Sequence, residues 1–512
     1  MLIKVFGAAV QGIDATLITI EVNSSRGCMF YLVGLPDSAV KESHQRIISA
    51  LQVNGYRMPT SNIVINMAPA DIRKEGAAYD LPLAIGILAA SEVIQSDKLE
   101  RYLLMGELSL DGSLQPIKGA LPIAIKAREL GFEGMIVPQQ NAHEAAVVNN
   151  LKVYGAGNIK EVIEFFNGTQ ELTPTLVNTR EEFYSQQSNF DFDFAEVKGQ
   201  ENVKRALEVA ASGSHNILLI GSPGSGKSML AKRLPSILPP LSLGESLETT
   251  KIHSVAGKLG KDGGLISKRP FRAPHHTIST VAMTGGGSFP QPGEISLAHN
   301  GILYLDELPE YSRNVLEVLR QPLEDRKITV SRIRCNVEYP ASFMLVASMN
   351  PCPCGYYTHP TKACVCSPGQ VQKYLNRISG PLLDRIDLQI EVTPLPFEEM
   401  ADSRPGESSA TIRERVIRAR QIQEARYADI PGIYCNAQMN SKLLARHARP
   451  DEKGLAMLKT AMNRLNLSAR AYDRILKVSR TIADLEGCEL IQPAHLAEAI
   501  GYRNLDREDW AG

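Results

Sequence analysis

Apolar residues occur along this chain in short runs that alternate with polar, helix-forming stretches. In the first third of the chain the apolar runs are "IVINMAP" from Ile63, "YLLMGEL" from Tyr102 and "GMIVP" from Gly134. Further along they are "NILLIG" from Asn216, "ILYLDE" from Ile302, "FMLVASMN" from Phe343 and "LQIEV" from Leu388. Continuous apolar strands separated by long connections are typical of a parallel sheet that is covered on both faces. The pattern predicts an α/β protein with a central parallel sheet.

Changes in composition divide the chain into blocks, since 512 residues are too many for one hydrophobic core. Residues 1–170 mix strands and helices and predict an α+β domain. Residues 171–196 carry six acidic residues against a single basic one, which predicts a linker. Residues 197–398 contain the runs of the parallel sheet. After a break rich in serine, proline and glycine, residues 411–507 predict a carboxy-terminal α-helical domain.

The strongest chemical signal is "GSPGSGKS", which follows the strand "NILLI" and precedes the helical "MLAKRL". This is the context of a phosphate-binding loop, in which glycines let backbone amides close around a β-phosphate. Lys227 would neutralise the β- and γ-phosphates and Ser228 would hold Mg²⁺. The sequence therefore predicts that ATP and Mg²⁺ bind here. The expected nucleotide contacts are Gly221, Ser222, Pro223, Gly224, Ser225, Gly226, Lys227, Ser228 and Met229.

Two later strands end in residues that suit nucleotide hydrolysis. Asp306, at the end of "GILYLD", would complete the Mg²⁺ shell with Ser228. Glu307 beside it would orient and deprotonate the attacking water, which predicts a hydrolase rather than a kinase. Asn350 ends the strand "FMLVASMN" and would help to place that water.

An arginine precedes the last predicted strand, in "GPLLDRIDL". Arg385 is well placed there to reach the γ-phosphate of a neighbouring subunit and supply positive charge in trans. The alternative is an ion pair within the same chain, because Asp384 and Asp387 flank it.

Basic residues gather in two places although the whole chain carries a net charge of −1. "RKITVSRIRCNVEYP" predicts two strands with Arg332 and Arg334 at their tip, where they would contact nucleic-acid phosphates. A solvated hairpin tip is the alternative. Residues 411–480 hold 15 Lys and Arg against 6 Asp and Glu, which would attract either nucleic acid or the nucleotide and an adjacent subunit.

Four of the eight cysteines lie in "NPCPCGYYTHPTKACVC", residues 350–366. The spacing of Cys352, Cys354, Cys364 and Cys366 gives two close pairs, as in four-thiolate zinc sites, although C-x-x-C is the commoner pair. His359 is a substitute ligand. A zinc ion held by four protein ligands would be structural rather than catalytic. A disulfide pair or unliganded thiols are the alternatives.

The other four cysteines are scattered, as in proteins of a reducing compartment. No apolar run reaches the ~18 residues of a membrane span, and the amino terminus does not resemble a secretory signal. We therefore expect a cytoplasmic protein without a membrane segment.

The run from the phosphate loop through "PFRAPHHTIS", "GEISLAHNGILYLDELPE", "ASMNPCPCG" and "SGPLLDRIDL" resembles the ComM/YifB family of AAA+ ATPases. This resemblance implies a homo-hexameric ring ATPase, and for ComM a DNA helicase that promotes branch migration during natural transformation. Its partners would be single-stranded and branched DNA and the recombinase machinery. The resemblance also implies that Asn350 is sensor 1, Arg385 the arginine finger and Arg470 sensor 2, with Arg474 a weaker candidate.

By the same resemblance, the glycine-rich "TGGGSFPQPGEIS" and the arginine-tipped hairpin would project into the central pore of the ring. The amino-terminal block resembles the Lon-type protease fold, also known in RadA recombination proteins. Ala78 and Leu121 stand where the active proteases have serine and lysine, and Lys118 is displaced, so we expect no proteolysis. The alternative functions are a magnesium-chelatase-like motor for metal insertion into a tetrapyrrole, and a protein remodeller or scaffold.

Overall fold

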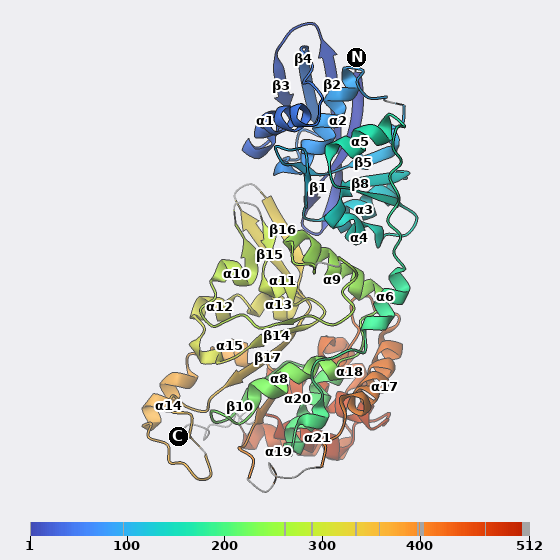
Figure 1. The fold of residues 1–512 in the computed structure, drawn as a ribbon. Helices are drawn as coiled ribbons and strands as arrows, with labels where there is room; N and C mark the ends of the chain where they lie inside the picture. Colours follow the sequence, from blue (N-terminus) through green and yellow to red (C-terminus); the bar gives the residue numbers. More distant parts are fainter. Residues whose placement is uncertain are drawn as a thin grey trace. The chain divides into compact units, whose positions relative to one another are not determined.

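The computed structural model describes residues 2–95, 97–260, 263–287, 290–332, 335–357, 359–396, 399, 404–465 and 467–503 (Figure 1). Its contacts divide the chain into two compact units. The amino-terminal unit comprises Met1–Gln186 and Leu243–Ser267, and the carboxy-terminal unit comprises Gln187–Ser242 and Lys268–Gly512. No helix among the described residues is long and apolar enough to span a membrane.

A seven-stranded mixed sheet forms the centre of the amino-terminal unit, in the order β3-β4-β2-β1-β5-β8-β9. β1 and β2 form a long antiparallel hairpin and β4 pairs antiparallel with β2, whereas the remaining pairs are parallel. The three apolar runs expected in this block are β4, β5 and β8. The strand bounds are Leu2–Gln11 for β1, Asp14–Ser25 for β2, Phe30–Val33 for β3, Asn62–Ala68 for β4, Tyr102–Leu104 for β5, Gly134–Pro138 for β8 and Lys152–Ala156 for β9.

Helices of this unit include α1 (Ser38–Val53), α2 (Asp80–Ala90), α3 (Ala120–Glu129), α4 (Gln139–Ala146) and α5 (Ile159–Phe166). Every residue of α2 is buried. The helix packs directly on the β1–β2 hairpin, and a Cβ on Gly86 would lie 2.8 Å from Val22 Cγ2. The close approach therefore requires a glycine at this point of the helix.

The amino-terminal unit is completed by a later segment that contains α9 (Leu243–Ala256). Leu247 and Leu265 pack against its core, and Gly119 N donates to Ser254 O at 3.2 Å. The hydroxyl of Ser254 donates to the buried carboxylate of Glu144. The sequence predicts that 197–398 is one continuous domain, but the structure assigns residues 243–267 to the other unit, because their apolar and polar partners lie there.

The predicted linker at residues 171–196 differs from an extended polar connection. It contains α6 (Thr179–Gln186) and a short 3₁₀ turn, Phe194–Glu196. Phe183 is 2% exposed and Phe194 is fully buried, so aromatic side chains anchor this segment. The acidic composition concealed these anchors, since only two apolar positions in the segment are needed to fix it.

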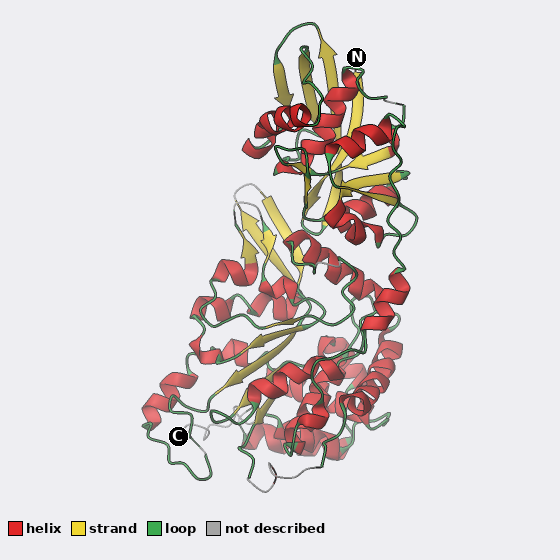
Figure 2. Cartoon of the chain, viewed as in Figure 1, coloured by secondary structure: helices red, strands yellow, loops and turns green. Residues whose placement is uncertain are grey.

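Five parallel strands form the main sheet of the carboxy-terminal unit, in the order β11-β14-β17-β10-β18. The predicted central parallel sheet is confirmed, and the four apolar runs are four of its strands. Figure 2 shows helices around the sheet. The bounds are Ile217–Ile220 for β10, Phe271–Arg272 for β11, Ile302–Leu305 for β14, Met344–Met349 for β17 and Leu388–Glu391 for β18.

Two antiparallel hairpins accompany this sheet. One is β12 (Gly285–Gly286) with β13 (Gln291–Pro292), and the other is β15 (Lys327–Arg332) with β16 (Cys335–Pro340). Arg334 lies outside the described residues, so the structure supports the predicted hairpin without placing the side chains at its tip.

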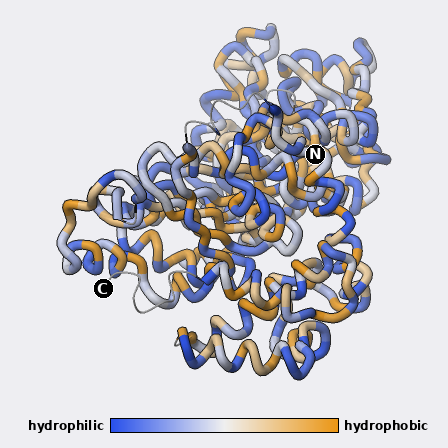
Figure 3. Tube along the Cα trace, turned by 90° about the horizontal axis from the view of Figure 1, so that it is seen from below, coloured by the Kyte–Doolittle hydropathy of each residue, from blue (hydrophilic) through white to orange (hydrophobic). Residues whose placement is uncertain are grey.

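The carboxy-terminal helices are α17 (Ser409–Tyr427), α18 (Ser441–His447), α19 (Glu452–Arg464), α20 (Ala469–Leu485) and α21 (Pro493–Gly501). α17 and α20 pack on α7 (Glu201–Gly213), so Ile475 and the sheet residue Ile217 belong to one core. Figure 3 shows that hydrophobic and hydrophilic residues alternate in short stretches along the chain. The last helix of the domain expected at 411–507 ends at Gly501, and residues 504–507 lie outside the described part.

Candidate nucleotide-binding site

The phosphate loop connects β10 to α8 (Lys227–Arg233) at the carboxyl end of the parallel sheet. A Cβ on Gly221 would lie 2.3 Å from the carbonyl oxygen of Val392, so only glycine fits there. Gly224 and Gly226 have φ angles of 81° and 93°, in the left-handed region that glycine adopts readily. These three glycines let the loop curl tightly between strand and helix.

Polar groups inside the loop fit a nucleotide phosphate. The hydroxyl oxygens of Ser222 and Ser225 are buried and have no hydrogen-bond partner among the described residues. Buried hydroxyls normally find a partner, and phosphate oxygens are acceptors that both could use. Of the other predicted nucleotide contacts, Pro223 lies within this loop, and Met229 follows it in α8 and is 37% exposed.

Lys227 folds back onto the loop. Its Nζ donates to the carbonyl oxygens of Gly221 at 2.6 Å and Ser222 at 2.9 Å, and to Asn350 Oδ1 at 3.3 Å. Burial lowers the pKa of Lys227 because desolvation penalises its charged form, although Asp306 and Glu307 act in the opposite direction. A phosphate would add negative charge beside this ammonium group and favour its charged form.

Asp306 lies at the end of β14 in a network of hydroxyl groups. Ser228 Oγ donates to Asp306 Oδ2 at 2.9 Å, and the hydroxyl of Ser348 donates to Oδ1. Burial alone would raise the pKa of Asp306, but the hydrogen bonds from Ser348, Ser228 and Tyr304 bring it below its ordinary value. An ionised carboxylate beside a hydroxyl is an oxygen ligand set that Mg²⁺ prefers, so the predicted pair fits that ion.

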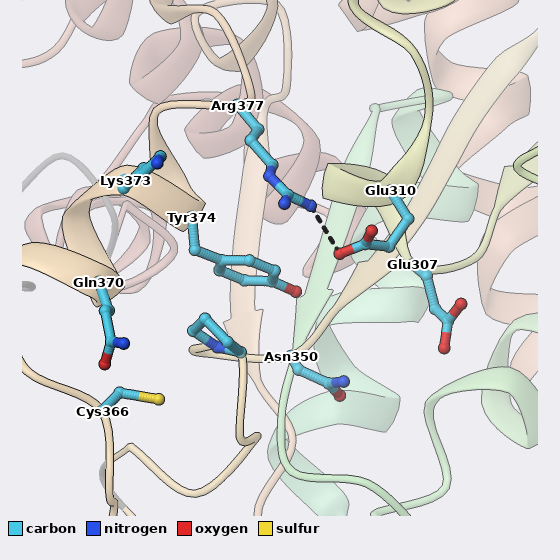
Figure 4. A pocket seen from close by; sticks show the side chains of 9 residues that line it. Glu307, Glu310, Asn350, Cys366, Gln370, Lys373, Tyr374 and Arg377 are labelled. Carbon is cyan, nitrogen blue, oxygen red and sulfur yellow. Dashed lines mark hydrogen bonds and ion pairs between the residues drawn. The ribbon is translucent and has the colours of Figure 1, made fainter.

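Glu307 and Asn350 line one pocket of about 480 Å³ (Figure 4). Glu307 has a φ of 55°, an uncommon conformation for a residue with a side chain, and its side chain is 56% exposed. In the same pocket, Arg377 NH1 binds Glu310 Oε1 at 2.9 Å. The remaining lining residues are Pro353, Cys366, Gln370, Lys373 and Tyr374.

The predicted arginine finger lies at the opposite edge of the sheet. β10 and β18 are parallel with Ile217 opposite Leu388, so Arg385 precedes the strand pair whereas the phosphate loop follows it. Arg385 is 6% exposed, and its guanidinium forms an ion pair with Glu324 of α13 (Arg320–Asp325). The structure therefore shows the intrachain ion pair that the sequence left open as the alternative.

The two sensor-2 candidates lie near Arg385 and not at the phosphate loop of their own chain. Arg470 NH1 is 3.3 Å from Asp384 Oδ2, and its side chain is 61% exposed. Arg474 NH1 is 3.1 Å from Asp387 Oδ1. Burial would raise the pKa of Asp387, but Arg474 and the hydrogen-bonded His215 hold it well below its usual range. Arg470 therefore does not lie at the phosphate loop of its own chain, where the γ-phosphate would bind.

The four loop cysteines converge on one point. The Sγ atoms of Cys352 and Cys354 are 3.3 Å apart. The Sγ of Cys364 lies 3.7 Å from that of Cys352 and 3.6 Å from that of Cys354. All four sulfurs, including that of Cys366, lie within 4.8 Å of one another. Four thiolates bound tetrahedrally at ~2.3 Å from one zinc ion would be separated by about 3.8 Å, so the cluster fits a metal ion.

His359, the substitute ligand, is engaged elsewhere. Its Nδ1 accepts hydrogen bonds from the amides of Thr361 at 3.1 Å and Lys362 at 3.0 Å. Desolvation would raise the pKa of the Cys354 thiol, but hydrogen bonds from the backbone amides of Tyr356 and Val365 lower it to about 6. The four cysteines alone therefore form the candidate metal site.

Several residues of the site were not predicted from sequence. Ser348 and Tyr304 hold Asp306, and Lys373 and Arg377 line the pocket. Ser348 is a polar residue inside an apolar strand, which was a usable signal. Lys373 lies in the last turn of α14 (Pro368–Leu375), and Arg377 lies in the turn that follows this helix.

The fold and the site together define a phosphate-loop nucleotide-binding protein with an AAA+ type fold. Three protein-family models match the chain. Magnesium chelatase, subunit ChlI, matches residues 193–400, subunit ChlI of Mg-chelatase matches 20–141, and the ChlI C-terminal model matches 406–503.

Individual proteins match over almost the whole chain. The chain is 45% identical to competence protein ComM of Haemophilus influenzae, over 98% of this chain and 97% of that protein. It is 43% identical to the uncharacterized protein YifB of Escherichia coli, over 98% of this chain and 96% of that protein. A magnesium-chelatase 38 kDa subunit of Rhodobacter capsulatus is 26% identical over 31% of this chain and 50% of its own length. The chain therefore belongs to the ComM/YifB family of magnesium-chelatase-like AAA+ ATPases.

Two substitutions separate nucleotide binding from hydrolysis. Lys227→Ala removes the ammonium group from the loop and is expected to abolish ATP binding, measured with a fluorescent ATP analogue. Glu307→Gln keeps the side-chain volume but removes the base, so binding should persist while turnover falls by about 10²-fold or more. Lys232→Ala, an exposed lysine on the same helix, serves as the control. Normal turnover by the Glu307→Gln protein would refute the role assigned to that carboxylate.

Proposed function

We propose that this chain is an ATP hydrolase that works as a homo-hexameric ring and moves along DNA, acting as a helicase in branch migration during natural transformation. The observation that carries the proposal is the separation of Arg385 and Arg470 from the phosphate loop of their own chain. Its expected location is the cytoplasm, with single-stranded or branched DNA and recombination proteins as partners.

A single chain does not bring all the predicted catalytic groups together. Three residue steps of β10 and β18, about 10 Å of strand, lie between the edge that carries Arg385 and the edge that carries the phosphate loop. Side chains at opposite ends of parallel strands cannot converge on one phosphate. If both arginines serve catalysis, the phosphate they reach is bound by another copy, which requires a closed ring or an open helical arrangement.

The two hairpins support the choice of DNA as the substrate. Tyr339 OH donates to Pro290 O at 2.8 Å, so the arginine-tipped hairpin contacts the end of the glycine-rich one. Arg332 and Arg334 would contact phosphates without selecting a sequence. The name of the H. influenzae relative, a competence protein, points to the uptake of DNA. Metal insertion into a tetrapyrrole is supported less, since the matching chelatase subunit covers only 31% of this chain.

We assign a non-proteolytic role to the amino-terminal unit, as a Lon-like collar of the ring. Leu121, at the position of the catalytic lysine, is fully buried in α3. Lys118 lies instead beside Gly257, the residue that follows α9. A Cβ placed on Gly257 would lie 3.1 Å from the Cε of Lys118. Leu121 has no amine, and Lys118, although exposed, is displaced by three residues from the position that a serine–lysine dyad requires.

We assign a structural zinc ion to Cys352, Cys354, Cys364 and Cys366. The loop does more than protrude, since Pro353 and Cys366 line the pocket with Glu307 and Asn350. A Cβ on Gly355 would lie 2.5 Å from Pro223 Cδ, so the loop also packs on the phosphate loop. A metal ion that fixes the cysteines would thereby fix one wall of the hydrolysis site.

The proposed DNA motor is tested by the response of hydrolysis to DNA. Single-stranded DNA is expected to raise the ATP turnover of the purified chain several-fold, and the protein should separate a branched DNA substrate only when ATP is hydrolysed. Glu307→Gln is the matched control, because it should bind DNA and ATP without strand separation. Turnover that is unaffected by DNA, together with ATP-dependent insertion of Mg²⁺ into protoporphyrin with chelatase partner subunits, would support the alternative.

Mixed rings test whether Arg385 acts on another copy. Arg385→Ala is expected to keep ATP binding and lose turnover, and Lys227→Ala to lose both. In a one-to-one mixture, about one junction in four joins an intact phosphate loop to an intact arginine, so part of the turnover should return. Glu324→Gln, which removes only the intrachain partner, is the control. Full turnover by a strictly monomeric protein contradicts the ring.

Elemental analysis tests the metal site. The purified protein is expected to carry about one zinc ion per chain, consistent with apparent binding energies of ~10–16 kcal/mol for such sites. Cys364→Ser should lose the ion and lower turnover by about tenfold or more through the displaced pocket wall, with ATP binding retained. Cys28→Ser, at an exposed cysteine outside the loop, should do neither. A metal-free preparation with full activity rules out the zinc staple.

A further inference from the structure

Glu307 and Asn350 share a pocket of about 480 Å³ with side chains of α14 and of the turn that follows it (Figure 4). Asn350 Oδ1 accepts a hydrogen bond of 3.3 Å from Lys227 Nζ, so the asparagine connects the phosphate loop with this pocket. The share of one water molecule in the liquid is ~30 Å³, so the pocket has room for a small anion together with water.

Hydrogen-bond donors without a partner gather in this pocket. Lys373 has neither an ion pair nor a hydrogen bond among the described residues. Arg377 uses only NH1 for its hydrogen bonds within the described part of the chain, one of them to Glu310 Oε1 at 2.9 Å. Gln370 Oε1 accepts from Ser367 N at 2.9 Å, which leaves the amide nitrogen of its side chain to donate. Free donors favour a ligand that is rich in acceptor oxygens, as a phosphate ion is.

Two carboxylates limit how tightly an anion could bind here. Glu310 forms an ion pair with Arg377, and Glu307 lines the same pocket. The two cationic side chains are therefore matched by two acidic ones, so the pocket attracts an anion through local hydrogen bonds rather than through a large net charge. Weak binding suits a product, because a product must leave in every cycle.

We propose that this pocket receives the inorganic phosphate that ATP hydrolysis forms, with Lys373 and Arg377 as its cationic contacts. In that reaction the water oxygen forms a bond to the γ-phosphorus, the bond from phosphorus to the ADP oxygen breaks, and Glu307 takes the proton of the water. The phosphate is thus released beside Glu307 and Asn350, at the mouth of the pocket that they line. The inference rests on the proposed ATP hydrolysis, and it requires neither DNA nor a ring.

Inhibition by added phosphate tests the pocket. Full-length Lys373→Gln should require about tenfold more inorganic phosphate for half-inhibition of ATP turnover, the effect of losing one charge-assisted hydrogen bond. Glu310→Gln frees Arg377 from its carboxylate partner and should lower that concentration several-fold, which the loss of a merely structural contact would not do. Broadening of the phosphorus NMR signal of inorganic phosphate by protein saturated with MgADP measures binding without turnover, and it should rank the variants in the same order.

An exchange of two neighbouring residues is the matched control. The double variant Gln372→Lys with Lys373→Gln keeps the net charge, but successive residues of an α-helix point about 100° apart, so the ammonium group moves away from the pocket. Gln372 does not line the pocket, and the double variant should bind phosphate as weakly as Lys373→Gln alone. Phosphate inhibition of Lys373→Gln equal to that of the unsubstituted chain overturns the proposal. Full phosphate binding by the double variant also overturns it, because net charge alone would then explain the binding.

A non-hydrolysable ATP analogue separates the product from the substrate. Its affinity for Lys373→Gln should equal its affinity for the unsubstituted chain. A loss as large as the loss for phosphate overturns the proposal, because Lys373 would then contact the γ-phosphate of ATP itself. If the purified chain does not hydrolyse ATP, the proposed hydrolase fails, while the phosphorus NMR signal still decides whether the pocket binds phosphate.

Discussion

Parallel pairing of β10 with β18 is the constraint on which the rest of the site depends. Because of this pairing, the phosphate loop lies at one edge of the sheet, where β10 ends, and Arg385 lies at the other edge, where β18 begins. Backbone hydrogen bonds and a buried core fix this arrangement, so thermal motion of side chains does not bring the two edges together. The chemistry of phosphate transfer needs both positive charge and a cradle, and in this fold Arg385 and the phosphate loop lie at opposite edges of the sheet.

The buried carboxylate of Asp387 stabilises the edge that carries the arginines. It accepts a hydrogen bond of 3.0 Å from the backbone amide of Asn216, and it contacts the side chains of His215 and Arg474, which lie on other parts of the same unit. A buried charge with several partners is costly to disturb, since each partner removed leaves the carboxylate undersatisfied. The buried Arg385 and the exposed Arg470 therefore lie beside a stiff support.

The sequence was informative where chemistry and strand order coincide. The phosphate loop, Asp306, Glu307 and Asn350 each follow an apolar strand, and the parallel sheet brings the ends of such strands to one edge. It was uninformative where a contact joins distant segments. Nothing local in "PFRAPHHTIS" indicates that His276 meets Glu307, and the ion pair of Arg385 with Glu324 spans 61 residues.

The division of the chain illustrates the same limit. Residues 171–196 look like a polar linker because their composition is acidic, yet two buried phenylalanines fix them. Likewise α9 follows the phosphate-loop helix in sequence and was assigned with it, whereas its partners Gly119 and Glu144 lie more than a hundred residues earlier. Local pattern predicts which elements form, and tertiary contacts decide to which body each belongs.

The position of α9 has a consequence for how the protein is made. The amino-terminal unit lacks its last packed segment until residue 267 has been synthesised, which is after the phosphate loop has been synthesised. No single cut of the chain separates one unit from the other, because residues 243–267 of the first are inserted into the sequence of the second. In this respect the two units differ from domains joined end to end, which can be exchanged by recombination at a single linker.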